Sequence, residues 1–310
     1  MSAVAPRPSP LVDVAWLAAH AGDPRVRVAD VRWYLGGKRG ADEYERGHIP
    51  GAVFVDLGRD LAAPPGRGPG RHPLPAPADF ARVLARLGVT RDTLVIAYDD
   101  AGGSIAARLW WMLRWIGHPG GRVLDGGLGA WTAAGQALTT DVPVIAPAPL
   151  LEVTVLGPGV VDKREVDRLR AEPGAVILDA RSRERFEGVS EPIDARPGHI
   201  PGARSAPFAD NLVAPGGVLR PAAELVKHYG ALGALDAATV VCSCGSGVTA
   251  CHDILALTLA GRDDALLYEG SWSDWAADSA LPAAKGPALT ALTALESAPR
   301  ETERRNPTES

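Results

Sequence analysis

The order of apolar and polar positions along the chain predicts short strands that alternate with longer helices. The strands, which are β-branched apolar runs, are expected over residues 26–30, 93–98, 175–179 and 239–243. The helices, in which apolar residues recur every three or four positions, are expected over 79–87, 104–116, 222–229 and 248–259. This alternation is typical of an α/β fold, in which a mainly parallel sheet carries helices on both faces.

The same series of motifs occurs twice in the same order. The sequence GHIPGA stands at 47–52 and again at 198–203, and D-V-R at 30–32 is matched by D-A-R at 179–181. A Leu-Gly pair precedes the central predicted strand in both halves, and a glycine-rich segment ending in tryptophan follows the next helix. Ordered matches of this kind predict two copies of one domain.

Proline-rich and charged stretches separate and flank the two copies. Residues 142–149 are Pro-rich and should run as an extended connector, while 300–305 form a charged run without apolar periodicity. We therefore expect an N-terminal domain over 10–140, a linker over 141–158, a C-terminal domain over 159–283 and a disordered tail over 284–310.

Composition narrows the class of protein. With 46% apolar and 22% charged residues, the 310-residue sequence is that of a soluble globular protein. The net charge of −5, without a basic block, gives no footprint for nucleic acid or an anionic membrane. No stretch is apolar enough for a signal peptide or a membrane span. Three cysteines, all between 242 and 251, cannot cross-link a fold of this size, so we expect a reducing compartment, by default the cytoplasm.

Cys244, directly after the predicted strand 239–243, is the strongest candidate for chemistry. The loop that follows it consists of Gly245, Ser246, Gly247, Val248 and Thr249. The glycines leave backbone N–H groups uncovered, and N–H groups that converge before a helix form a cradle for an anion. Because the thiolate is the nucleophilic form of cysteine, this cradle favours a reactive Cys244 over a packing residue.

The loop sequence C-G-S-G-V-T at 244–249 resembles the active-site loop of the rhodanese superfamily, in particular its mercaptopyruvate sulfurtransferase branch. GHIPGA at 198–203 and the G-S-W at 270–272 resemble two further segments of that family, and the resemblance covers nearly the whole chain. It implies two rhodanese-like domains and a sulfurtransferase that needs no cofactor or metal. Such an enzyme carries sulfur as a Cys244 persulfide from 3-mercaptopyruvate or thiosulfate to a thiol, thioredoxin-like or cyanide acceptor.

The two copies differ at the position of the cysteine. Aligning the central strands places Asp99 opposite Cys244. A carboxylate is not a sulfur nucleophile, so the N-terminal domain is expected to be non-catalytic and to contribute a wall of the cleft.

Basic residues near Cys244 are expected from the segment 179–186. Asp179 and Arg181 are interpreted as a structural ion pair, whereas Arg185 resembles the substrate-binding arginine of the family. The mercaptopyruvate branch commonly carries a second arginine nine residues further on, where this sequence has Asp194. Arg196 is the candidate substitute, from a shifted loop.

The N-terminal domain is expected to supply His72 to the cleft, because residues 71–75 resemble a family segment that carries a histidine there. The acid that the family supplies matches poorly, and Asp56 or Asp60 is the candidate replacement. His48 and His199 recur in both copies although only one is catalytic, so we interpret both as structural.

Cys242 and Cys251 are interpreted as packing residues. A zinc site made by the three cysteines and His252 is disfavoured, because strand, loop and helix would splay the ligands.

Three functional classes follow. A phosphatase of related fold would need an arginine six residues after Cys244, where Ala250 stands, and a non-catalytic interaction module would not need the glycine loop. A sulfurtransferase accounts for both the glycine loop and the absence of an arginine at position 250. Thiosulfate-preferring relatives carry basic residues in a C-R-K-G-V-T loop. With Gly245 and Ser246 there, we expect 3-mercaptopyruvate to be the donor, with the Ser246 hydroxyl near its carbonyl or enolate oxygen.

Overall fold

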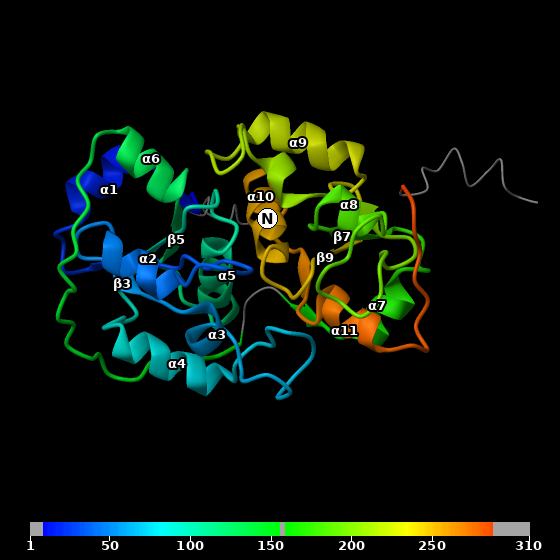
Figure 1. Cartoon of the computed structure of the whole chain (residues 1–310), viewed down its shortest axis with the longest axis horizontal. Coiled ribbons are helices and arrows are strands. Elements are labelled where there is room, and N and C mark those ends of the chain that lie inside the picture. The colour runs from blue at the N-terminus through cyan, green and yellow to red at the C-terminus, as the bar shows by residue number, and fades with distance from the viewer. Residues whose placement is uncertain (1–8, 156–158, 288–310) are drawn as a thin grey trace, which may run out of the picture.

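A computed structural model describes residues 9–155 and 159–287 of the chain and shows two parallel five-stranded sheets. The first sheet has the order β1-β5-β4-β2-β3, with β1 Leu11–Val12, β2 Val26–Asp30, β3 Val53–Phe54, β4 Leu94–Tyr98 and β5 Gly121–Leu124. The second has the order β6-β10-β9-β7-β8, with β6 Val160–Val161, β7 Ala175–Asp179, β8 Arg204–Ser205, β9 Thr239–Ser243 and β10 Leu266–Tyr268. The identical topology confirms the predicted duplication and the α/β fold class (Figure 1).

Helices follow the strands in the same order in both halves. Those of the first domain are α1 Val14–His20, α2 Gly40–Arg46, α3 Leu57–Asp60, α4 Pro77–Arg86, α5 Ala106–Trp115 and α6 Gly127–Ala133. Those of the second are α7 Lys163–Leu169, α8 Arg183–Phe186, the 3-10 helix η1 Phe208–Asn211, α9 Ala222–Ala231, α10 Ala250–Leu259 and α11 Ser271–Ala277. Both α5 and α10 begin two residues later than predicted, because the loop before each helix is part of an anion cradle rather than of the helix.

The two domains are joined by a continuous apolar core. Helices α5 and α10 lie side by side at the centre of the molecule, and nearly every residue of each is buried (Figure 1). A helix that is buried on all sides has apolar residues on every face, and α5 and α10 therefore lack a clear polar face. One hydrophobic cluster contains residues of both domains, including Trp110 and Ile254. The loops before α5 and α10 are therefore held at a fixed interface.

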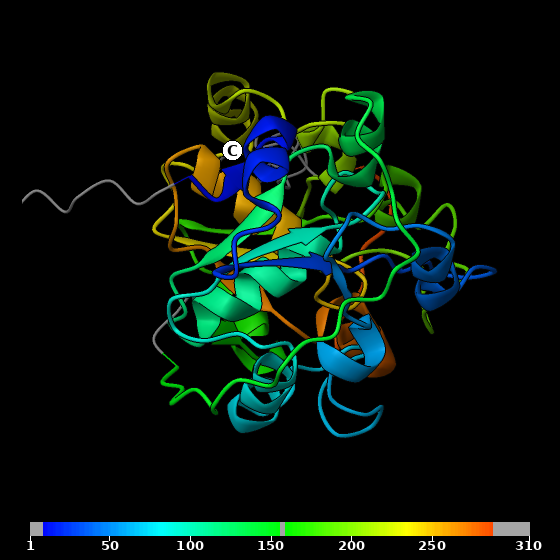
Figure 2. The same ribbon diagram turned by 90° about the vertical axis from the view of Figure 1, so that its left-hand side faces the viewer.

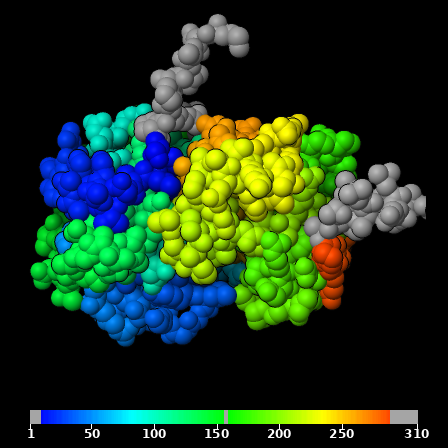
Figure 3. All heavy atoms as spheres, turned by 90° about the horizontal axis from the view of Figure 1, so that it is seen from above, coloured from blue at the N-terminus to red at the C-terminus, as the bar shows by residue number. Residues whose placement is uncertain are grey.

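A loop of the second domain extends this interface. Figure 3 shows the two halves of the chain in close contact, with the segment after η1 reaching toward the first half. The Leu219 N–H donates to Asp125 Oδ1 at 2.8 Å, and Leu212 packs against Gly102.

The described part of the predicted linker, residues 141–155, runs along the first domain without helix or strand (Figure 2). Ile145 packs against Gly88, and the Ala148 N–H donates to the Ala85 carbonyl at 2.8 Å. The linker is thereby bound to the first domain before it enters the second. Residues 156–158, also predicted as linker, lie outside the described residues.

The folded part of the second domain extends past residue 283, where we predicted its end. Ala284 pairs with His199 in an isolated β-bridge, and the Gly286 N–H donates to the Glu187 carbonyl at 2.9 Å. The rest of the predicted tail, from residue 288 on, lies outside the described residues. Within the described ranges, no helix has the length and apolarity to cross a bilayer.

Candidate active site

Cys244 lies at the carboxyl end of β9, in the middle of the second sheet. In the second sheet Asp179 pairs with Ser243, and in the first sheet Asp30 pairs with Tyr98. The next residues along the two central strands are Cys244 and Asp99, so the register confirms that they occupy equivalent positions. Cys244 is 2% exposed, and the loop after it contacts Arg71 and Arg108 of the first domain.

Backbone N–H groups hold the sulfur of Cys244. Its Sγ accepts the N–H of Ser246 at 3.4 Å and of Gly247 at 3.1 Å. The N–H groups of Val248 and Thr249, which we expected to join them, make no such bond to Sγ in the described residues. Two of the five predicted residues, Ser246 and Gly247, thus hold the sulfur of Cys244 itself.

Ser271, which the sequence reading missed, fixes the shape of this loop. Its Oγ accepts the N–H groups of Cys244 and Gly247, both at 3.0 Å, and donates to the Tyr268 carbonyl at 2.8 Å. Ser271 has φ +52, which is strained for a residue with a Cβ. In the sequence, Ser271 belongs to the G-S-W segment at 270–272. That segment indicated the family but did not predict the contacts of its serine.

The first domain holds an anion of its own in the equivalent loop. The carboxylate of Asp99 accepts N–H groups from Ala101 and Gly103 on Oδ1 and from Ile105 and Ala106 on Oδ2, at 2.8 to 2.9 Å. A carboxylate at this position satisfies the cradle permanently and supplies no sulfur nucleophile. This geometry supports the prediction that the first domain is non-catalytic.

His72 reaches the cradle from the first domain, as expected. Its Nδ1 lies 2.8 Å from Ser246 Oγ, and its ring packs edge-on against Trp33. Burial, with Arg108 and Arg71 nearby, lowers the pKa of His72 to about 4. The imidazole is therefore neutral at pH 7 and can exchange a proton with the Ser246 hydroxyl.

Arg108, a second residue that sequence reading missed, ties the loops of the two domains together. It is fully buried in α5 and donates to the carbonyls of Gly247 at 2.9 Å and His72 at 3.0 Å. The sequence feature that could have identified Arg108 is its position inside a mainly apolar helical run, because a buried arginine needs polar partners.

The Asp179–Arg181 pair is structural by its geometry. Arg181 binds both oxygens of Asp179 and the Gly198 carbonyl, and its guanidinium stacks over the ring of Trp272. Arg32 makes the same contacts with Asp30 and Gly47 in the non-catalytic domain. A contact that recurs where no nucleophile is present stabilises the fold rather than the reaction.

Arg185 lies beside the loop after Cys244, as predicted. It donates to Glu191 at 2.8 Å and to Asp194 at 2.9 Å. Its Nη1 lies 3.5 Å from where a Cβ would stand on Gly245. An acidic pair thus holds the arginine against the cradle.

Arg196 is not brought to this site. Its guanidinium donates to the carbonyls of four residues around the end of α11, which are Trp275, Ala276, Asp278 and Leu281. These backbone acceptors use its N–H donors, so our expectation that Arg196 replaces the second arginine was wrong. Arg71, adjacent to His72, lies nearer: its Nη2 would be 3.0 Å from a Cβ on Gly245.

The remaining candidates are engaged in structural contacts. Asp56 caps α3 by accepting the Arg59 N–H, and Asp60 pairs with Arg59 and Arg86. His48 and His199 each stack on an aromatic ring and bond the carbonyl of that same residue, which confirms their structural interpretation.

Cys242 and Cys251 are fully buried, as expected for packing residues. Burial raises the pKa of Cys251 to about 12 and the pKa of Cys242 well above its ordinary value. Among the described residues, no group of His, Cys, Asp and Glu side chains could hold a metal ion.

Alkylation of the folded protein is therefore expected to modify one thiol. Treatment with iodoacetamide at pH 8 should add one carbamidomethyl group, on Cys244, because the raised pKa values of the other two thiols keep them protonated. After unfolding, all three free thiols should react. Intact-mass measurement with peptide mapping gives the count, and modification of Cys251 in the folded protein would contradict this reading.

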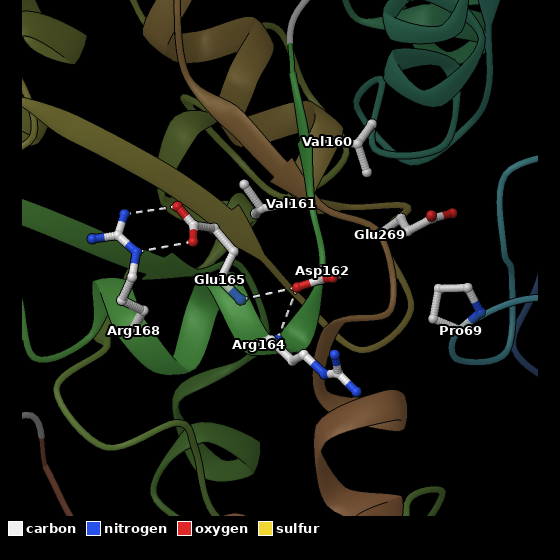
Figure 4. A pocket seen from close by; sticks show the side chains of 8 residues that line it. All are labelled: Pro69, Val160, Val161, Asp162, Arg164, Glu165, Arg168 and Glu269. Atoms are coloured by element: carbon white, nitrogen blue, oxygen red, sulfur yellow. Dashed lines mark hydrogen bonds and ion pairs between the residues drawn. The ribbon is translucent and has the colours of Figure 1, made fainter.

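A cavity of about 620 Å³ lies beside β6 and the start of α7 (Figure 4). It is lined by Pro69, Val160, Val161, Asp162, Arg164, Glu165, Arg168 and Glu269. The carboxylate of Asp162 caps α7 and Arg168 pairs with Glu165, so these side chains have partners of their own. The lining contains neither Cys244 nor any residue predicted for its chemistry.

Comparisons with known proteins agree with this geometry. The family description "Rhodanese-like domain" matches twice, over residues 13–134 and 162–278. A relative from Pseudomonas aeruginosa that bears the name of a 3-mercaptopyruvate sulfurtransferase is 43% identical over 282 residues, covering 89% of this chain and 98% of its own. A relative from Mycobacterium tuberculosis, named as a thiosulfate sulfurtransferase, is 39% identical over 290 residues, covering 90% of this chain and 98% of its own.

Among solved structures, SseA from Escherichia coli, described as a 3-mercaptopyruvate sulfotransferase, superposes with a TM-score of 0.75 at 34% identity, covering 86% of this chain and 100% of that chain. The family match on each half, the full-length relatives and the superposition all agree with the duplicated sheets and the cysteine loop. The chain therefore belongs to the rhodanese-like family, among its tandem-domain sulfurtransferases.

Proposed function

We propose that the protein moves a sulfane sulfur from 3-mercaptopyruvate to a thiol or cyanide acceptor through a persulfide on Cys244. The observation that carries this proposal is the Cys244 sulfur held by two backbone N–H groups, with Arg185 beside the same loop. The names of relatives from Pseudomonas aeruginosa and Escherichia coli support the choice of donor.

In the proposed reaction the Cys244 thiolate attacks the sulfur of the donor. The carbon–sulfur bond breaks, and its electron pair stays on carbon as the enolate of pyruvate. The enolate takes up the proton that the donor thiol gives up and leaves as pyruvate, and the sulfur stays on Cys244 as a persulfide anion. In this proposal the Ser246 hydroxyl, which lies 2.8 Å from Nδ1 of His72, holds the enolate oxygen or passes that proton.

The N–H groups of the loop then hold the negative charge of the persulfide. An acceptor thiolate or cyanide attacks the outer sulfur, the sulfur–sulfur bond breaks, and Cys244 returns as a thiolate. No oxidant or reductant is consumed in this cycle, which agrees with our expectation that the protein uses no cofactor.

The charge of the loop favours a monoanionic donor. Thiosulfate is a dianion, and neither Gly245 nor Ser246 carries a charge that could neutralise the departing sulfite. One carboxylate, as in 3-mercaptopyruvate, matches a guanidinium such as that of Arg185. A charge-assisted contact contributes about 1.5 to 3 kcal/mol, which is roughly one to two decades in rate or affinity.

The kcat/KM with 3-mercaptopyruvate is therefore expected to exceed that with thiosulfate at least about tenfold. The measurement compares both donors side by side with cyanide as acceptor, and the Cys244→Ser variant serves as the blank for uncatalysed transfer. A preference for thiosulfate would overturn the loop-charge argument and would match the name of the Mycobacterium tuberculosis relative instead.

The same proposal includes a thioredoxin-like thiol as the acceptor and the cytoplasm as the location. Three free, buried cysteines suit a reducing compartment, where such acceptors are available.

A further inference from the structure

Two guanidinium groups from different domains converge on the loop after Cys244. A Cβ placed on Gly245 would lie 3.0 Å from Nη2 of Arg71 and 3.5 Å from Nη1 of Arg185. Arg71 belongs to the first domain, where its own N–H donates to Ser273 Oγ of the second domain at 3.1 Å. Arg185 belongs to α8. The absence of a side chain on Gly245 gives both groups access to this point.

Acidic residues hold the far sides of both guanidinium groups. Asp194, 4% exposed, accepts from Nη1 of Arg71 through Oδ1 and from Nη2 of Arg185 through Oδ2. Glu191 accepts from Nε and Nη2 of Arg185 at 3.3 and 2.8 Å. In residues 9–155 and 159–287, no protein acceptor binds Nη2 of Arg71 or Nη1 of Arg185. The donors nearest the cradle are therefore the ones left for a ligand.

The unbonded N–H donors at this point favour an anion, because Asp194 and Glu191 already balance the charges of the two arginines. Burial and the positive charge of Arg185 lower the pKa of Arg71, whereas the negative charge of Cys244 raises it. Arg71 thus interacts electrostatically with both the second arginine and the sulfur. Two guanidinium groups with their planar N–H donors aimed at one place match the two oxygens of a carboxylate.

We propose that Arg71 and Arg185 form a two-arginine subsite for the carboxylate of the sulfur donor, and that Arg71 determines donor specificity from the non-catalytic domain. The inference rests on the proposed function and names the ligand class as short thiol carboxylates. Asp194, which pairs with both arginines, then offsets part of their positive charge. An arginine from the first domain thus takes the place of the one that the sequence lacks at position 194.

Steady-state kinetics with 3-mercaptopyruvate provide the first test. In Arg71→Ala the KM should rise about 10- to 100-fold, with a smaller change in kcat, and Arg71→Lys should recover part of the loss. Arg67→Ala is the matched control, because Arg67 lies exposed in the same loop and carries the same charge. Thermal melting of each variant shows that it is folded.

A second test does not depend on sulfur transfer. Iodoacetate and iodoacetamide both alkylate cysteine, but only iodoacetate carries a carboxylate. The ratio of their rates at Cys244 therefore reports the anion subsite alone. Arg71→Ala should lower this ratio about tenfold, whereas Arg67→Ala should leave it unchanged. Asp194→Asn removes a negative charge and keeps both arginines, so the ratio should stay the same or rise.

The outcomes separate the subsite from the proposed function. Wild-type protein that does not turn over 3-mercaptopyruvate, yet shows the alkylation pattern above, would overturn the function and keep the subsite. An unchanged ratio in folded Arg71→Ala would overturn the subsite, and so would an equal fall of the ratio in Asp194→Asn. The last result would mean that Arg71 only ties the domains together through Asp194.

Discussion

Replacing Cys244 by serine is expected to abolish sulfur transfer, by a factor of at least about 10⁴, while the fold stays intact. The serine hydroxyl is isosteric and can accept the same N–H groups from Ser246 and Gly247, so the loop keeps its contacts. It is not ionised at neutral pH and forms no persulfide. Turnover with 3-mercaptopyruvate measures the loss, and the melting temperature shows that folding is unaffected.

Mass spectrometry locates the transferred sulfur directly. After treatment with the donor, wild-type protein should gain one sulfur atom on Cys244, and Cys244→Ser should gain none. Cys242→Ser is the matched control, because Cys242 is fully buried on the same strand and its removal should leave the gain in mass in place. Transfer that survives in Cys244→Ser and disappears in Cys242→Ser would refute the assignment.

Gly247→Ala is expected to be the most damaging small substitution in the loop. Gly247 has φ +74, and a Cβ there would lie 2.4 Å from the carbonyl oxygen of Glu269. The left-handed backbone costs about 1 to 2 kcal/mol for alanine, and the clash about 1 to 3 kcal/mol more. Movement of the loop also displaces an N–H that binds Cys244 Sγ, and loss of one such donor lowers kcat about 10²- to 10³-fold.

Gly135→Ala separates the two causes. Gly135 also has φ +74, but no atom lies within 4 Å of the position of its Cβ. Alanine there should lower the free energy of unfolding by about 1 to 2 kcal/mol and leave kcat unchanged. Chemical denaturation and turnover of both variants give the comparison. Equal effects at the two positions would show that the clash at Glu269 is absorbed without moving the cradle.

The local sequence pattern was sufficient to predict those parts of the site that are contiguous in sequence. A β-branched strand, a cysteine, a glycine loop and a helix predict the position of Cys244 and its N–H donors from residues 239–259 alone. The internal repeat placed Asp99 opposite Cys244, which the strand register bears out. Strands of two residues, such as β1 and β6, are too short to show a period and were not predicted.

The contacts between distant residues could not be predicted in this way. Arg71 binds Asp194 across 123 positions of the chain. Asp194 departs from the family pattern in the second domain, and the arginine that binds it comes from the first domain. Arg196 was assigned wrongly because the carbonyl groups that bind it are main-chain atoms, which leave no trace in side-chain chemistry. Ser271 binds backbone N–H groups of a loop 24 to 27 residues away for the same reason.

Asp99 also bears on how each half of the protein responds to its surroundings. A ligand that binds only the folded state stabilises that state by mass action. In the first domain the anion is part of the chain, bound by four N–H groups, so its contribution does not depend on the concentration of a ligand. In the second domain the sulfur of Cys244 occupies the cradle, and the group held there changes when Cys244 is sulfurated. Because the two domains share one apolar core, the folding equilibrium of the whole protein is therefore linked to the catalytic state of Cys244.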